Sequence, residues 1–223
     1  LSDDCNRVMR AASVIGQEFD IDRLGWVVDG VSETALIDAL EESAAAHVIE
    51  EAPDFPAGRR RFTHALIQQT LLEELSTSAR VRLHARLVEA LEALPPDQQE
   101  RRAVELAYHA SEAEAAVGAD KLIRYSSMAG DQALAAYAYE DAVRHFQRAL
   151  DAKDGLAMDD QTVEALFGLG RAQGAIDQVT EAWASLNRAF DFYVGSDDMP
   201  RAIAVAEYPL FHVPGLTDTT RMA

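Results

Sequence analysis

The stretch RRRFTHALIQQTLLEEL, residues 59–75, decides how the rest of the chain divides. Its first residues alternate, with Arg60, Phe62 and His64 on one face, and this alternation predicts a short strand. From Leu66 to Leu75 the apolar residues follow the spacing of a helix instead. We therefore expect the backbone to change from extended to helical at His64.

The residues up to this stretch predict three helices followed by a hairpin. The helices are expected at residues 3–15, 21–28 and 32–45, from apolar spacing and capping residues. The run HVIEEA, the turn-rich segment PDFPAG and the run RRFTH then predict two strands joined by a turn. Three helices and a hairpin are the outline of a winged helix, so we expect such a domain over residues 1–75. Its wing would be the loop Pro53–Gly58.

After Ser76 the sequence predicts helices only. They are expected at about 78–94, 98–114, 119–136, 138–152, 159–175, 179–194 and 198–212. Short polar connections separate them, which favours antiparallel packing of neighbours. The expected fold is thus mainly α, with a second domain of helix pairs over residues 76–223.

One spacing of small and large residues occurs twice in these helices, 40 residues apart. The first copy is Gly130, Ala142, Phe146 and Ala149, and the second is Gly170, Ala182, Leu186 and Ala189. A small residue lets one helix approach the next, and the alanines and the large residue form the facing surface. The pattern resembles the tetratricopeptide repeat, whose usual unit is about 34 residues. The clearest units would cover about 119–152 and 159–194, with the extra length in the loop around Lys153–Asp160.

A simpler explanation of the recurrence is also open. Any two pairs of amphipathic helices in an alanine-rich chain give some matching positions. The agreement of all four offsets favours the repeat.

Composition narrows the functional classes. The 223 residues are 48% hydrophobic and 26% charged, as in a globular protein. The net charge of −18 disfavours nucleic-acid binding, which depends on Lys and Arg contacts to phosphate. No apolar run approaches the ~18 residues of a membrane span, and no secretory leader is recognisable. The single cysteine, Cys5, fits a reducing compartment, so a cytoplasmic location is expected. The start at Leu1 suggests a piece of a longer protein.

Four segments together resemble one group of bacterial proteins. They read AASVIGQEFDIDRL, LIDALEESAAAHVIEE, RRFTHALIQQTLLEELSTSARVRLHARLVEALEAL and YAYEDAVRHFQRALD. They are similar to signal-transducing ATPases with numerous domains (STAND ATPases), including LuxR-type regulators of the maltose-regulator kind. The resemblance covers residues 1 to about 152, and the remainder only as helical repeats. It implies a P-loop ATPase module upstream, then a winged helix, then a helical-repeat sensor.

The resemblance also implies ATP or ADP as the cofactor of the intact protein. No G-x-x-x-x-G-K-[ST] motif occurs in this chain, so we expect it to bind no cofactor and hydrolyse no nucleotide by itself. No HExxH, CxxC or GxSxG motif occurs either, and the sequence predicts no catalytic or metal-binding residue.

The resemblance implies a role for His64. In the family, a Phe-x-His or Met-His-Asp element at this junction brings the winged helix to the nucleotide phosphates and favours the ADP-bound state. An imidazole beside the free N–H groups of a helix N-terminus suits phosphate oxygens. This chain has Ala65 where related motifs carry Asp, and Gln68 where a basic residue is frequent. The alternative is a histidine that only caps or packs at the junction.

The run Arg59, Arg60 and Arg61 is a candidate interaction patch. It could be a wing that grips DNA, a solvated hairpin flank, or a contact to the ATPase module. The net charge and the lack of basic residues in 32–45 disfavour DNA.

These observations predict a non-catalytic regulatory segment of a larger signalling ATPase or transcription regulator. Its partners would be its own upstream ATPase module and a protein or small effector on the repeats. The alternative is a free-standing repeat scaffold that binds a peptide or protein, and a DNA-binding winged helix ranks third.

Overall fold

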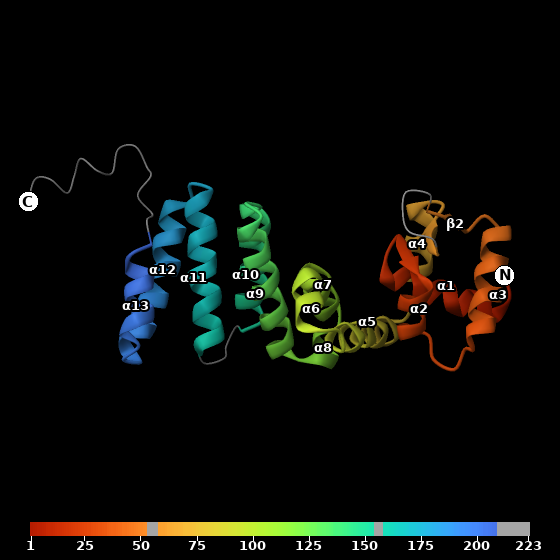
Figure 1. Cartoon of the computed structure of the whole chain (residues 1–223), viewed down its shortest axis with the longest axis horizontal. Coiled ribbons are helices and arrows are strands. Elements are labelled where there is room, and N and C mark those ends of the chain that lie inside the picture. Colours follow the sequence, from red (N-terminus) through yellow and green to blue (C-terminus); the bar gives the residue numbers. More distant parts are fainter. Residues whose placement is uncertain (53–57, 154–157, 209–223) are drawn as a thin grey trace, which may run out of the picture. The chain divides into compact units, whose positions relative to one another are not determined.

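The computed structural model describes residues 1–52, 58–153 and 158–208 (Figure 1). These residues are mainly helical, with thirteen helices and one sheet of three short strands. They form two compact units, the first from Leu1–Pro95 with Tyr108–Gly118 and the second from Pro96–Ala107 with the described residues from Ala119 onwards. None of the described helices is both long and apolar enough to cross a membrane.

The first three helices begin at capping residues that the sequence supplies. They are α1 (Asp3–Ile15), α2 (Ile21–Val27) and α3 (Glu33–Ala45). The side chains of Ser2, Asp20 and Ser32 each accept a hydrogen bond from a backbone N–H three residues further on. These bonds satisfy N–H groups that the first turn of a helix leaves free, and they explain why the predicted starts are accurate.

The sheet contains one strand that the sequence did not predict. β2 (Ile49–Glu51) and β3 (Arg59–Phe62) pair antiparallel, as the predicted hairpin requires. β1 (Glu18–Asp20) adds to the other edge of β3, giving the order β1-β3-β2. Three residues are too few for an alternating pattern to be visible, so β1 gave no periodic signal. The predicted wing falls largely on residues 53–57, which lie outside the described residues.

The core of the first unit lies between the sheet and the helices. Phe19 of β1 and Phe62 of β3 are both buried, with their ring centres 5.4 Å apart. Buried residues of α1, α2 and α3 pack on them, with Leu87 of α5 (Thr77–Glu92) in the same cluster. Helix α5 therefore packs with the first unit, on α1 and α2, although it follows the change to helix-only composition at Ser76.

The predicted single helix at 98–114 is wrong. The structure has α6 (Pro96–Arg101), α7 (Ala103–Glu112) and α8 (Glu114–Val117) instead. At the first break the N–H of Arg102 is shared between the carbonyl oxygens of Gln98 and Gln99, at 3.2 and 3.0 Å. A shared bond of this kind is common at helix ends, but apolar spacing continues across it and does not reveal it.

Five helices of the second unit pack on one another in chain order (Figure 1). They are α9 (Ala119–Ala135), α10 (Tyr139–Asp151), α11 (Asp160–Ala175), α12 (Val179–Gly195) and α13 (Met199–Ala206). Helix α13 ends at Ala206, earlier than the predicted residue 212. Residues 209–212 lie outside the described part.

Three turns between these helices have the same backbone. Tyr137, Asp177 and Asp197 all have left-handed φ angles, of 60°, 61° and 61°. In each turn the next residue's N–H donates to the carbonyl five residues earlier, at 2.8 to 3.0 Å. This closure of a helix end normally uses glycine at the left-handed position, and without glycine these turns could not be recognised from the sequence.

Candidate functional site

The junction between β3 and α4 (Ala65–Glu73) is held by backbone bonds from both sides. The N–H of Phe62 donates to the carbonyl of Gln17 at 3.0 Å, and the N–H of Thr63 donates to that of Val48 at 3.1 Å. The hydroxyl of Thr63 donates to the carbonyl of His47 at 2.8 Å. These bonds fix the direction in which α4 leaves the sheet.

His64 is the residue that precedes α4. Its backbone is extended (φ −140°, ψ 137°), and its side chain makes no capping hydrogen bond. The imidazole is exposed, and two residues later the side chain of Leu66 is 71% exposed. The junction therefore presents an imidazole, an uncapped helix N-terminus and an apolar side chain on its surface.

Gln68, where related motifs often carry a basic residue, has a structural role. Its side-chain N–H donates to the carbonyl of Ser13 at 2.9 Å, which ties α4 to α1. The positive charge that a basic residue would add at this position is absent from the junction.

Each arginine of the candidate patch faces a carboxylate of a neighbouring strand. The N–O distances are 3.7 Å for Arg59–Glu18, 2.8 Å for Arg60–Glu51 and 2.7 Å for Arg61–Glu50. Exposed pairs of this kind add little stability, but they cancel the charge that a phosphate backbone would meet. A partner of this face has to replace or tolerate three carboxylates.

The residues of the repeated spacing make equivalent contacts in two helix pairs. A β-carbon at Gly130 of α9 would lie 2.7 Å from the Phe146 ring of α10, and one at Gly170 of α11 would lie 2.7 Å from Leu186 of α12. The alanines of the pattern are all buried: Ala142, Ala149, Ala182 and Ala189. Each glycine thus leaves the space that the large residue of the next helix fills.

A third glycine in this packing was missed by sequence reasoning. Gly168 of α11 faces the Phe146 ring even more closely than Gly130 does, so one ring lies between glycines of two helices. The available signal was the sequence Gly-Leu-Gly at 168–170 inside an otherwise helical pattern, where glycine is unfavourable without a packing reason.

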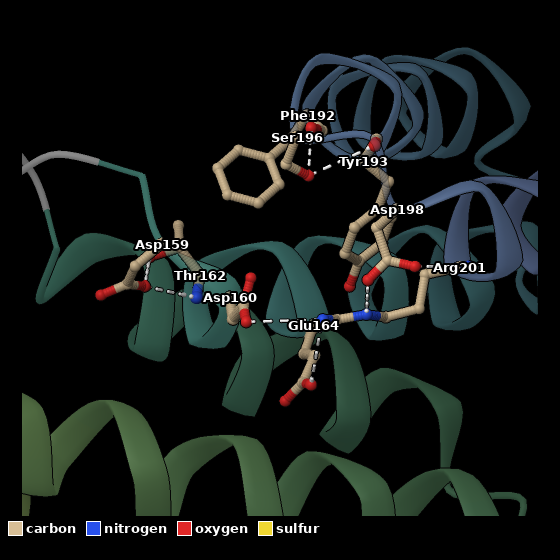
Figure 2. A network of polar contacts seen from close by, with 9 residues as sticks. All are labelled: Asp159, Asp160, Thr162, Glu164, Phe192, Tyr193, Ser196, Asp198 and Arg201. Carbon is tan, nitrogen blue, oxygen red and sulfur yellow. Dashed lines mark hydrogen bonds and ion pairs between the residues drawn. The ribbon is translucent and has the colours of Figure 1, made fainter.

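Arg201 joins the last described helix to the two before it (Figure 2). Its guanidinium bonds to Asp198 at 2.6 Å and lies 3.5 and 3.8 Å from carboxylate oxygens of Asp160 and Glu164 on α11. It also lies 5.0 Å from the ring centre of Tyr193 on α12. The hydrogen bond to Asp198 is the largest of the contacts that raise the pKa of Arg201. This network orients α13 on the helix array.

The start of α11 carries a second polar cluster, of which Figure 2 draws Asp159 and Thr162. The carboxylate of Asp159 accepts from the N–H and the hydroxyl of Thr162, at 3.0 and 2.7 Å, and from the Lys153 ammonium at 2.6 Å. The bond from Lys153, followed by those from Thr162, lowers the pKa of Asp159 to about 2. This cap fixes the N-terminus of α11.

The first unit also buries two histidines that sequence reasoning did not place together. His84 of α5 and His109 of α7 are each 1% exposed, and both belong to the first unit. The Tyr108 ring lies edge-on to His84, with centres 5.7 Å apart. The two histidines are far apart in sequence and come together only when α5 and α7 pack, so the sequence does not indicate the pair.

The His64 junction and the helix pairs are separate candidate surfaces, one in each compact unit. The junction offers donors for an anion, and the helix pairs offer an extended surface for a partner. No family of proteins, no curated protein and no solved structure matches the chain. Both candidate surfaces therefore stand on the geometry and chemistry of these residues.

Proposed function

We propose that this chain is a non-catalytic regulatory segment of a larger cytoplasmic signalling ATPase or transcription regulator. In this role a winged helix couples the nucleotide state of an upstream module to a tetratricopeptide-like array. The observation that carries the proposal is the repeated fit of Gly130 to Phe146 and of Gly170 to Leu186. Matching contacts at one offset are what stacked repeats require.

The element order of the first unit supports the winged-helix part. Up to the end of β3 the order is helix, strand, two helices and two strands, with β3 between β1 and β2 in the sheet. A winged helix needs such a sheet against its helices, and the Phe19–Phe62 contact supplies the packing between β1 and β3.

The second unit supports a binding role for the array. Arrays of helix pairs present extended surfaces on which partners bind. Several large apolar side chains of α12 and α13 are exposed, among them Trp183 at 41%, Phe190 at 36% and Ile203 at 52%. A protein partner or a small effector would bind this unit.

His64 is assigned the coupling contact. A switch needs an interaction that differs between its two states, and an exposed imidazole at an uncapped helix N-terminus can gain or lose a phosphate contact. In the intact protein, the ADP-bound state would make this contact and the active state would lack it.

The test uses the full-length protein with His64→Ala. We expect faster loss of bound ADP and higher basal activity, measured by nucleotide release and by the activity of the intact protein. The matched control is Gln69→Ala, because Gln69 is exposed on α4 and its side chain donates to Glu73 of the same helix. If His64→Ala retains ADP as the parent does and activates at the same threshold, the sensor role is wrong.

The second candidate function is a free-standing scaffold that binds a peptide through the helix pairs. The exposed apolar side chains of α12 and α13 favour it equally, because they need no nucleotide module. A reading frame that continues upstream of Leu1 into a Walker motif would exclude this alternative.

A further inference from the structure

A hollow in the first unit is lined by four arginines, although the chain as a whole has a net charge of −18. Its volume is about 560 Å³, and α1, the end of α2 and α5 line it. Arg7 and Arg10 come from α1, three residues apart, and Arg82 and Arg86 come from α5, four residues apart. Both spacings place the two side chains on one helix face, so two basic faces share one hollow.

Two of these arginines hold the surrounding elements together. Arg86 donates to the carbonyl of Val27 at 2.9 Å and pairs with Asp29, which fixes the end of α2. Arg10 pairs with Glu74 at 2.8 Å and so links α1 to the residues after α4. Their charges face the hollow, but their hydrogen bonds are largely used within the protein.

The other two arginines are available to a ligand. Among the described residues Arg7 pairs with Asp4 of its own helix, at 3.0 Å, and both side chains are more than half exposed. Arg82 donates its Nε to the carbonyl of Ser78 at 3.3 Å. In the ranges that the structure describes, no carboxylate pairs with Arg82, so its terminal nitrogens keep free donors.

The rest of the hollow is mixed in character. Its apolar lining residues include Ala11, Val28 and Leu83, which suit a hydrophobic group. Two acids also line it: Asp29, which is paired with Arg86, and Asp3, which has no ion pair in the described residues. The carboxylate of Asp3 repels an anion, so removing its charge should increase the affinity of the hollow for an anionic ligand.

We propose that this hollow binds a small phosphate monoester with an apolar body. A phosphate dianion offers enough acceptor oxygens for two guanidinium groups, which bind it through parallel hydrogen bonds. Arg82 and Arg7 hold the phosphate, and the apolar side chains contact the organic part. This binding is independent of His64 and of the nucleotide module, and it adds a ligand to the first unit.

The experiment is calorimetric titration of the chain 1–223 with phenyl phosphate at low ionic strength. We expect saturable one-to-one binding that Arg82→Ala weakens at least tenfold. Arg82→Lys should give a smaller loss, because it keeps the charge without the forked donors. The control is Arg144→Ala, which removes an exposed arginine of α10 that pairs with Asp141 of its own helix. Thermal melts of each variant check that it is folded.

Two further measurements separate this site from nonspecific attraction. Asp3→Asn should strengthen binding of phenyl phosphate, because it removes the repelling carboxylate and leaves the Ser2 cap of α1 in place. Inorganic phosphate and benzoate should both bind more weakly than phenyl phosphate. No saturable binding, or equal binding by the Arg82→Ala variant, would overturn the site. Benzoate binding as tightly as phenyl phosphate would overturn the assignment to phosphate.

Discussion

The Nδ1 atoms of His84 and His109 lie 2.8 Å apart in the buried part of the first unit. At this distance one ring donates and the other accepts, so the pair holds one proton between these nitrogens. Burial, reinforced by the charge of Arg80, lowers the pKa of His84 to about 4. Burial, reinforced by His84, lowers the pKa of His109 to about 3. The folded state therefore keeps both rings neutral.

The first prediction concerns the pH dependence of stability. An unfolded histidine has a pKa of about 6.5, so below that pH the unfolded chain binds protons that the folded chain does not. The contribution of the pair should be complete above about pH 6.5 and should fall as the pH drops towards 4. Urea unfolding at steps between pH 7.5 and 4.5 measures this change in the free energy of unfolding.

The comparison for this prediction is a His84→Gln/His109→Gln variant. It should be less stable at pH 7.5, but its stability should change less between pH 6.5 and 5. The single-histidine control is His47→Asn, which removes an exposed histidine at a left-handed position that asparagine tolerates. Parallel curves for the parent and the double variant would contradict the prediction.

The second prediction concerns the packing of Gly168. Alanine normally favours a helix over glycine by up to about 1 kcal/mol. At Gly168 the added β-carbon would overlap the Phe146 ring, so we expect Gly168→Ala to destabilise by about 1–3 kcal/mol. Gly25 of α2 has open space around the added carbon. Gly25→Ala should be stabilising, and chemical denaturation of both variants tests the contrast. Equal effects of the two changes would refute the overlap.

The third prediction concerns the left-handed turn at Asp177. A residue with a β-carbon in this conformation is disfavoured by about 1 kcal/mol or more, whereas glycine is not. Asp177→Gly should therefore raise the midpoint of thermal unfolding, with some of the gain offset by the freer unfolded chain. Asp191→Gly, in the interior of α12, should lower it. A lower midpoint for Asp177→Gly would show that the aspartate side chain stabilises the turn.

The fourth prediction concerns the cap of α11. Asp159→Ala removes the acceptor for Thr162 and Lys153, and we expect a loss of about 1 kcal/mol at pH 7. Asp159→Asn keeps a capping oxygen and should lose less. The pKa of Asp159 is lowered to about 2, so its contribution is complete above the unfolded pKa of about 3.9 and is lost as the pH falls towards 2. Denaturation of the three proteins at pH 7 and pH 3 measures both effects.

Part of this structure could be predicted because capping residues and strand-forming runs are visible in the local sequence. The starts of α1 and α3 follow from Ser2 and Ser32, and the hairpin follows from its β-type runs. The three-residue strand β1 and the break before α7 gave no periodic signal. Both depend on partners that are distant in sequence or on a single shared hydrogen bond.

The candidate sites divide in the same way. The exposure of His64 agrees with a residue at a helix start, and the Gly130–Phe146 spacing led to a real contact. The His84–His109 pair could not be predicted, because its members meet only after two helices pack. The arginine-lined hollow could not be predicted either. Arg82 is distinguished from the other three arginines by having no carboxylate partner in the described ranges, and the sequence does not show this.

The Phe146 ring, packed between Gly130 of one helix pair and Gly168 of the next, has a consequence for how the second unit unfolds. Neither pair can open without exposing this ring, because each pair supplies one wall of its site. Helices α9 to α12 should therefore unfold in one cooperative transition, and hydrogen exchange should show equal opening free energies in both pairs. A ligand that binds α12 and stabilises it would then also slow hydrogen exchange at the amides of α9, without any conformational change in the helices between them.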